Sequence, residues 1–332
     1  MNIRYLAFSD RGEALANKLA TETGGSVDRC PKGGLQEWTN RNFTQAAALV
    51  YVGSVGIAVR AIAPPIQSKV VDPAVVVIDE TGHYIVPVLS GHLGGANDLA
   101  KELSECTGGI AVITTATDRN GLFAVDEWAK RHGCTVANPD MIKHVSGKLV
   151  NGDDVIYYSD FPIEGAVPEG LKKGTREECD FQVSLNKIYT HATSLHLVPR
   201  VLVAGIGCKR GTPEEAIDTL FQEVLEQLHI SELAVCKVCS IDLKANEPGL
   251  QRFAYHHGLE FQTFSAEELN KVEGAFSASF FVKNTTGVDN VCERSAVLGS
   301  GGGELLLPKT AKNGVTVALA SLPVTLDWRW LK

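Results

Sequence analysis

Short apolar runs alternate with helix-like segments along most of this chain. In the first 133 residues, apolar runs predict strands at residues 3–8, 46–52, 74–78, 84–89 and 110–113. Asp10 with Glu13 resembles a capping box and predicts a helix that stops at Gly24. Further helices are predicted at residues 57–62, 98–106 and 123–131. This alternation indicates an α/β domain.

Turn signals place these strands relative to one another. The Asp-Glu-Thr-Gly sequence at residues 79–82 predicts a hairpin between the strands at 74–78 and 84–89. The loops at 53–56, 90–97 and 114–118 are polar or rich in glycine, and each follows a strand. If the strands are parallel, the three loops share the sheet edge at which open α/β sheets bind ligands.

The alternation weakens in the middle of the chain and then resumes. Residues 154–158, 181–185 and 195–198 predict short strands, and residues 162–178 predict a loop. A strand at 201–204, a turn at 205–211 and an amphipathic helix capped by Thr212 and Glu215 begin the last part. The predicted fold is α/β, with three-layer α/β domains at 1–133 and 199–332. A small α+β middle domain or connector is predicted at 134–198.

Composition narrows the function classes. The chain has 332 residues, of which 44% are hydrophobic and 21% charged, as expected of a folded globular protein. Its net charge of −8 and the lack of a basic block argue against nucleic-acid binding. No apolar run approaches membrane-spanning length, and the first ten residues are too short an apolar run for a signal peptide. The eight cysteines are scattered, which indicates reduced thiols, and we expect a cytoplasmic protein without membrane partners.

The segment from Ser90 to Asn97 is the first candidate site. A strand that enters a glycine-bearing turn and then a helix leaves backbone N–H groups free, and these favour an anion. His92, inside this turn, is either a general acid or base or a structural histidine that donates to a carbonyl. Gly94 and Gly95 allow a ligand to approach the backbone closely.

A second glycine-bearing turn follows the strand at 201–204. Gly205 and Gly207 have the spacing of a dinucleotide fingerprint, but Arg210 stands where the third glycine belongs. An anion site that uses N–H groups, Lys209 and Arg210 is therefore favoured over a nucleotide site. A turn that only redirects the chain remains the alternative.

Three further charged residues have two interpretations each. Glu80 is a solvated carboxylate of a hairpin turn or a catalytic base. Asp118 is a helix cap or a catalytic carboxylate, and Arg60 binds a substrate carboxylate or is a surface charge. These residue types match no metal centre, catalytic triad or P-loop, so by themselves they indicate only an α/β protein with anion-binding loops.

Several long motifs lie in both halves of the chain. The N-terminal motifs are Gly56-Ile57-Ala58-Val59-Arg60, Ser68-Lys69, Asp72–Glu80, Leu89–Asn97 and Val112–Asp118. The C-terminal motifs are Gly205–Gly211, Ser240–Lys244 with Glu247, and the regions of Glu293 and Pro308-Lys309. Together they resemble the cobalt-precorrin 5A hydrolases (CbiG) of anaerobic cobalamin biosynthesis, and the resemblance covers nearly the whole chain.

The resemblance implies a reaction and a substrate. The family opens the δ-lactone of a ring-contracted cobalt tetrapyrrole and releases acetaldehyde to give cobalt-precorrin 5B. The substrate carries the cobalt and the conjugated ring, so the protein needs no cofactor or metal of its own. Its partners are this substrate and neighbouring pathway enzymes. A binder or carrier of such intermediates without chemistry is the alternative.

The resemblance also suggests roles for residues. Lactone hydrolysis needs a base for water and donors for an oxyanion. The candidate catalytic residues are His92, Glu80 and Asp118. The candidate substrate-binding residues are Arg60, Lys69, Ser90, Gly94, Gly95, Asn97, Thr114, Thr115, Gly205, Gly207, Lys209 and Arg210.

Overall fold

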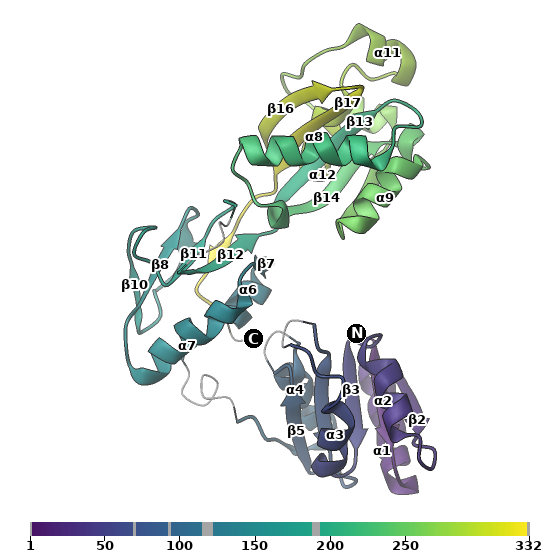
Figure 1. Ribbon diagram of the computed structural model, residues 1–332, viewed down its shortest axis with the longest axis vertical. Coiled ribbons are helices and arrows are strands. Elements are labelled where there is room, and N and C mark those ends of the chain that lie inside the picture. Colours follow the sequence, from purple (N-terminus) through teal and green to yellow (C-terminus); the bar gives the residue numbers. More distant parts are fainter. Residues whose placement is uncertain (1, 69–70, 92–93, 115–121, 188–192, 331–332) are drawn as a thin grey trace. The chain divides into compact units, whose positions relative to one another are not determined.

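The computed structural model describes residues 2–68, 71–91, 94–114, 122–187 and 193–330. The described residues form two compact units. The first comprises the chain up to Trp128 together with Leu149–Gly152, and the second comprises the remainder. The first unit contains one six-stranded sheet, and the second contains two five-stranded sheets and a two-stranded pair (Figure 1). The predicted three-domain boundaries stay a prediction.

The sheet of the first unit has the strand order β2-β1-β3-β4-β5-β6. The first four strands in this order are parallel, β5 is antiparallel to β4, and β6 is parallel to β5. The strands are β1 (Ile3–Ala7), β2 (Ser26–Arg29), β3 (Ala48–Val52), β4 (Ala74–Ile78), β5 (Tyr84–Leu89) and β6 (Ile110–Ala111).

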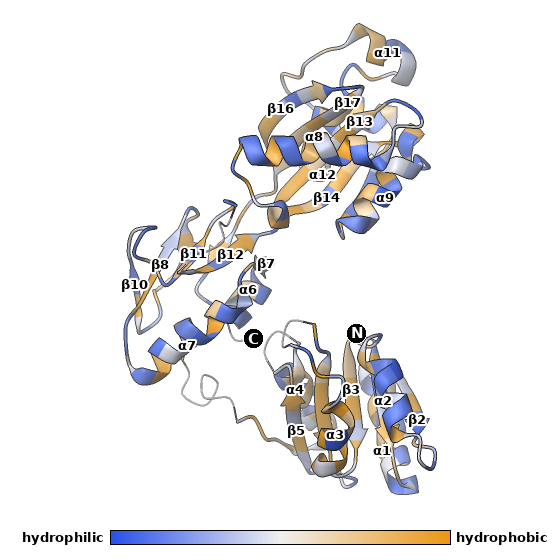
Figure 2. Ribbon diagram, viewed as in Figure 1, coloured by the Kyte–Doolittle hydropathy of each residue, from blue (hydrophilic) through white to orange (hydrophobic). Residues whose placement is uncertain are grey.

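Helices cover both faces of this sheet. One core contains Leu19 of α1 and Leu103 of α4, and the other contains Trp38 of α2 and Ile62 of α3. The apolar strands lie between helices whose outer faces are largely hydrophilic (Figure 2). The predicted three-layer arrangement is confirmed. The helices on this sheet are α1 (Asp10–Thr23), α2 (Leu35–Phe43), α3 (Val55–Ile62) and α4 (Ala96–Thr107). Helix α6 (Val125–Arg131) spans the division between the two units, which falls after Trp128.

The predicted hairpin of β4 and β5 is confirmed, and it changes where the loops lie. Because β5 runs against β3 and β4, the loop after β5 lies at the opposite edge from the loop after β3. The condition for a shared edge, that all the strands are parallel, is therefore not met. The loop 53–56 lies at one edge, and the described parts of the loops 90–97 and 114–118 belong to the other.

The middle sheet has the order β10-β8-β11-β12-β7, in which only β7 is antiparallel to its neighbour. All three predicted strands are present. The predicted loop at 162–178 is wrong in part, because it contains β9 and β10. The elements are β7 (Cys134–Val136), η1 (Pro139–Met141), α7 (Ile142–Asn151), β8 (Val155–Ser159), β9 (Ile163–Glu164), β10 (Leu171–Lys173), β11 (Phe181–Val183) and β12 (Leu195–Pro199).

The last sheet has the order β15-β14-β13-β17-β16, with β17 antiparallel to both of its neighbours. Helix α8 contributes Phe221 and α9 contributes Phe253 to the core on one face, and α12 covers the other face (Figure 1). The strands are β13 (Leu202–Cys208), β14 (Val235–Ile241), β15 (Glu260–Phe264), β16 (Glu304–Lys312) and β17 (Val315–Ser321). The helices are α8 (Glu214–Gln227), η2 (Glu232–Ala234), η3 (Asp242–Lys244), α9 (Pro248–His256), α10 (Ala266–Asn270), α11 (Phe280–Thr286) and α12 (Val291–Gly299).

The end of the chain returns to the region of the middle sheet. Strand β18 (Leu326–Asp327) pairs in parallel with β9. The Trp328 ring packs edge-on against Tyr157 of β8, with the ring centroids 4.7 Å apart. The yellow C-terminal segment in Figure 1 follows this return path.

Candidate functional site

The predicted site residues separate into several places. His92, Lys69, Thr115 and Asp118 lie outside the described residues. Ser90, Gly94, Gly95, Asn97 and Thr114 follow β5 or β6, whereas Glu80 follows β4. Gly205, Gly207, Lys209 and Arg210 belong to the second unit.

The turn after β5 uses its polar groups internally. Ser90 is buried, has φ of 55°, and its Oγ donates to the Asp72 carbonyl at 3.0 Å. The Ala96 N–H donates to the Ser90 carbonyl at 3.1 Å, and the Asn97 N–H donates to the Gly91 carbonyl at 3.0 Å. The expectation that the N–H groups opening this helix are free is therefore wrong for these two. The Asn97 side chain is only 2% exposed.

Glycine occupies positions 94 and 95 of this turn for two different structural reasons. A Cβ at Gly94 would lie 2.3 Å from the Ser90 Cβ, which is too close for any side chain. Gly95 has φ of 85° at the N-cap of α4, a conformation that favours glycine. Both glycines are explained by the shape of the turn.

The carboxyl ends of β1, β3 and β4 meet at the other edge. Ser9, the second residue after the end of β1, donates its hydroxyl to Glu80 Oε1, 71 positions away in the sequence. Ser9 is also the N-cap of α1, since its Oγ accepts from the Gly12 N–H at 3.1 Å. The predicted cap at Asp10 is thus wrong by one residue. A serine directly before an acidic helix start is a signal that could have identified Ser9.

This edge contains the topological switch point of the sheet. The chain passes from β1 to β2 on one side, and β3 lies on the other side of β1. Ligands of open α/β sheets bind in the crevice outside the carboxyl ends of strands at such a point. A half-buried hydroxyl–carboxylate pair here has the chemistry to accept a proton from water.

Strand β4 separates Glu80 from the turn of Ser90. Ser90 bonds to Asp72 before β4 begins, and Glu80 follows its end. A strand of five residues spans about 17 Å, so these two groups cannot act on the same bond of a substrate. Arg60 is exposed in the last turn of α3, which leads back toward the start of β4.

In the second unit, the predicted turn at 205–211 is wrong in extent. Strand β13 continues through Cys208, so Gly205 and Gly207 are strand residues. A Cβ at Gly205 would lie 1.8 Å from the Cys292 carbonyl oxygen, and one at Gly207 would lie 2.6 Å from Thr316 Oγ1. Close packing against α12 and β17 explains both glycines.

The actual turn is Lys209–Gly211, and a carboxylate of the chain already occupies part of it. Glu247 is buried and accepts from the Gly211 N–H at 2.7 Å and from Lys244 Nζ at 2.8 Å. Burial raises the pKa of Glu247, but these hydrogen bonds outweigh it and leave the pKa below its ordinary value. The side chains of Lys209 and Arg210 are exposed. The helix that follows starts at Glu214 without the predicted Thr212 cap.

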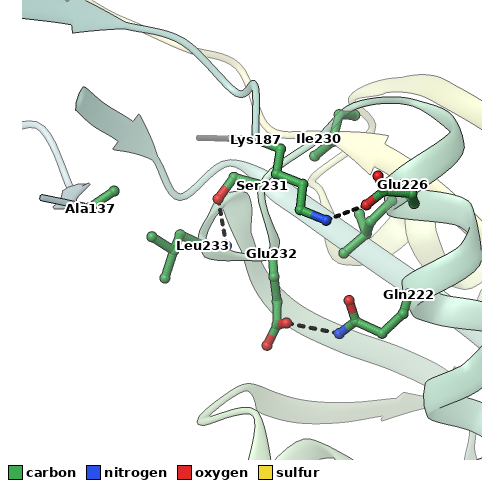
Figure 3. Close-up of a pocket in the computed structure, with 9 residues that line it drawn as sticks. Ala137, Lys187, Gln222, Glu226, Ile230, Ser231, Glu232 and Leu233 are labelled. Carbon is green, nitrogen blue, oxygen red and sulfur yellow. Dashed lines mark hydrogen bonds and ion pairs between the residues drawn. The ribbon is translucent and has the colours of Figure 1, made fainter. Parts of the chain in front are cut away.

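A separate pocket of about 280 Å³ lies beside α8 and η2 in the second unit. Lys187 pairs with Glu226 across it, and the Gln222 amide donates to Glu232 at 2.8 Å (Figure 3). No predicted site residue lines it. Each charged group of the lining already has a partner, since Lys187 and Glu226 pair with each other and Glu232 bonds to Gln222 and to His257 outside the pocket.

Two further findings concern the cysteines and the search for membrane-spanning helices. All eight cysteines are unpaired, which confirms the prediction of free thiols. Within the described residues, no helix is both long and apolar enough to cross a membrane.

Comparison with known proteins extends these observations. Three family models match the chain: "Cobalamin synthesis G N-terminal" at residues 37–118, "Cobalamin biosynthesis central region" at 123–203 and "Cobalamin synthesis G C-terminus" at 202–320. The cobalt-precorrin-5A hydrolase of Salmonella typhimurium is 37% identical over 300 residues, which cover 86% of this chain and 85% of that protein.

Two further matches also cover most of both chains. The cobalt-precorrin-5A hydrolase of Priestia megaterium is 33% identical over 300 residues, covering 85% of this chain and 80% of that protein. A crystal structure of a cobalamin biosynthesis protein G homolog from Sulfolobus solfataricus is 23% identical and covers 97% of both chains, with a TM-score of 0.39. Since the family models match along most of its length, this chain belongs to the cobalamin synthesis G (CbiG) family.

Proposed function

We propose that this chain is a cobalt-precorrin 5A hydrolase. The observation that carries the proposal is its similarity to two proteins with that name over more than four fifths of its length. The enzyme opens the δ-lactone of cobalt-precorrin 5A with water. Acetaldehyde is then released to give cobalt-precorrin 5B in anaerobic cobalamin biosynthesis.

Glu80 is the described residue best suited to activate the water. It lies at the carboxyl edge of the parallel strands, and its carboxylate accepts only one hydrogen bond within the described part of the chain. His92 and Asp118, outside the described residues, remain proposed alternatives. Arg60, Lys209 and Arg210 have exposed cationic side chains, which suit the carboxylates of a tetrapyrrole.

The substrate supplies the remaining chemistry. Its cobalt and conjugated ring accept the electrons of the carbon–carbon cleavage, so the proposal includes no cofactor bound by the chain itself. The unpaired cysteines support a reducing compartment, and we place the enzyme in the cytoplasm with neighbouring pathway enzymes as partners.

The test is anaerobic incubation of the purified chain with the cobalt-precorrin 5A lactone. Lactone opening is followed by mass spectrometry, and acetaldehyde is trapped as a hydrazone. We expect both to depend on the chain and to show turnover. Tight binding of the lactone without either product would overturn the proposal in favour of a carrier.

A further inference from the structure

We propose that Ser9 is a positioning residue that orients the Glu80 carboxylate for general-base catalysis. The inference rests on the proposed hydrolase function and assigns a role to a residue that no sequence motif indicated.

Ser9 and Glu80 meet where three strand ends converge. Ser9 follows β1, and Glu80 follows β4. The Gly53 N–H, directly after β3, donates to the Ile78 carbonyl at 2.8 Å, which joins the ends of β3 and β4. A Cβ at Gly12 would lie 3.3 Å from Ser9 Oγ and 3.4 Å from the Val52 carbonyl oxygen, so the first turn of α1 abuts the end of β3.

The neighbouring acid, Asp79, is occupied in a way that Glu80 is not. The Asp79 carboxylate accepts from the Thr81 N–H at 2.7 Å and from the His83 N–H at 3.0 Å, and it also accepts from the Thr81 hydroxyl and the Tyr84 N–H. These bonds hold the hairpin turn and lower the pKa of Asp79, although burial raises it. Asp79 is therefore structural, whereas Glu80 keeps acceptor capacity.

The two hydrogen bonds of Ser9 fix the direction of its proton. Its Oγ accepts from the Gly12 N–H, so the single hydroxyl hydrogen is directed to Glu80 Oε1. Among the described residues this hydroxyl is the only donor to Glu80. Oε2 and the remaining lone pair of Oε1 are left to accept from a water molecule.

The hydrolytic step balances with these groups alone. Glu80 takes a proton from water as the water oxygen bonds to the lactone carbonyl carbon, and the carbonyl electron pair moves to oxygen. When the carbonyl re-forms, the ring C–O bond breaks, and the leaving alkoxide takes the proton back from Glu80. The products are a carboxylic acid and a hydroxyl group, and Glu80 returns to its ionised form.

The test separates helix capping from carboxylate positioning. Ser9→Asp keeps a side-chain cap for α1 but removes the donor and adds a second negative charge beside Glu80. Ser9→Thr keeps both functions. Ser265→Ala is the matched control, since Ser265 also caps a helix, α10, and donates to a glutamate, Glu268 Oε2, at 2.7 Å.

We expect Ser9→Asp to lower kcat about 10- to 100-fold with little change in KM, a fraction of what a general base contributes. The acidic limb of its rate–pH profile moves to higher pH, because the added carboxylate disfavours ionised Glu80. Ser9→Thr restores the rate to within about 3-fold, and Ser265→Ala leaves kcat and the profile unchanged. Ser9→Ala lowers kcat when Glu80 is present. In a chain that already carries Glu80→Gln, it lowers kcat no further, because Ser9 acts through Glu80.

Thermal unfolding of each variant identifies any that fail to fold, and the Ser9→Thr variant and the Glu80→Gln background then carry the test. The inference is overturned if Ser9→Asp has the rate and pH profile of the wild type, or if Ser9→Ala slows both backgrounds equally. A wild-type chain that releases no acetaldehyde overturns the proposed function, and the role of Ser9 falls with it.

Discussion

Gly205 of β13 lies directly against Cys292 of α12, so closely that an alanine Cβ would be 1.8 Å from the Cys292 carbonyl oxygen. Helix α12 cannot move away from β13 without disrupting the packing of Cys292, Ala296 and Ala318. We expect Gly205→Ala to destabilise the chain by about 3 kcal/mol, the upper end of the cost of overpacking.

Urea unfolding of Gly205→Ala checks this expectation against Gly147→Ala. Gly147 lies within α7, and a Cβ there would meet nothing within 4 Å. This control variant should be more stable than the wild type by about 0.5 to 1 kcal/mol, since alanine is the better helix former. Equal midpoints for the two variants would contradict the packing explanation.

Glu293 is a second buried constraint, with an exposed fraction of 1%. Its carboxylate accepts from the N–H groups of Ser277 and Lys309 and from the Asn290 amide, each at 2.7 Å. Glu293→Gln would direct an amide NH₂ at donors, and we expect a loss of about 2 to 3 kcal/mol in unfolding free energy.

The matched variant is Glu267→Gln, whose side chain is 79% exposed in an ion pair with Lys271. It should change stability by less than about 0.5 kcal/mol. Chemical denaturation at constant pH compares the two, and similar losses would show that the Glu293 network adds nothing beyond a surface pair.

His196 makes stability depend on acid pH. Burial lowers its pKa, only partly opposed by a hydrogen bond to the Ser184 carbonyl. Below about pH 6.5 the unfolded chain takes up a proton that the folded chain resists, so stability falls as pH drops toward the folded pKa. Above that range this group contributes no pH dependence.

His196→Gln should remove up to about 1.4 kcal/mol of stability change per pH unit in the acid range. His83→Gln is the control, since His83 is exposed. Thermal midpoints measured from pH 5 to 8 test this, and parallel curves for the wild type and His196→Gln would contradict it.

The end of the chain contributes to the second unit. Trp328 is 5% exposed and packs edge-on against Tyr157. We expect Trp328→Ala to cost about 3 to 5 kcal/mol. Arg329→Ala, at a side chain that is 73% exposed, should cost less than about 1 kcal/mol. Urea midpoints that move equally in both variants would contradict the expected contribution of Trp328 packing.

The sequence predicted the strands that are buried on both faces. All five residues of β3 and all five of β4 are buried, so each appears as a continuous apolar run. The patterns gave no prediction for β2 and α2, because β2 has no fully buried residue and α2 consists mostly of polar residues. The continuation of β13 through Gly205 and Gly207 was also missed, because glycines after a strand are typical of a turn.

By itself, the sequence determined the α/β class, the β4–β5 hairpin and the family, since these depend on local periodicity, turn residues and long motifs. Only the tertiary structure decided which polar groups share an edge. The reversal of β5 put the turn of Ser90 about one strand length from Glu80, whereas the parallel direction of β1, β3 and β4 brought Ser9 to Glu80. Strand direction and order are set by packing between distant segments, and no local pattern encodes a contact across 71 positions.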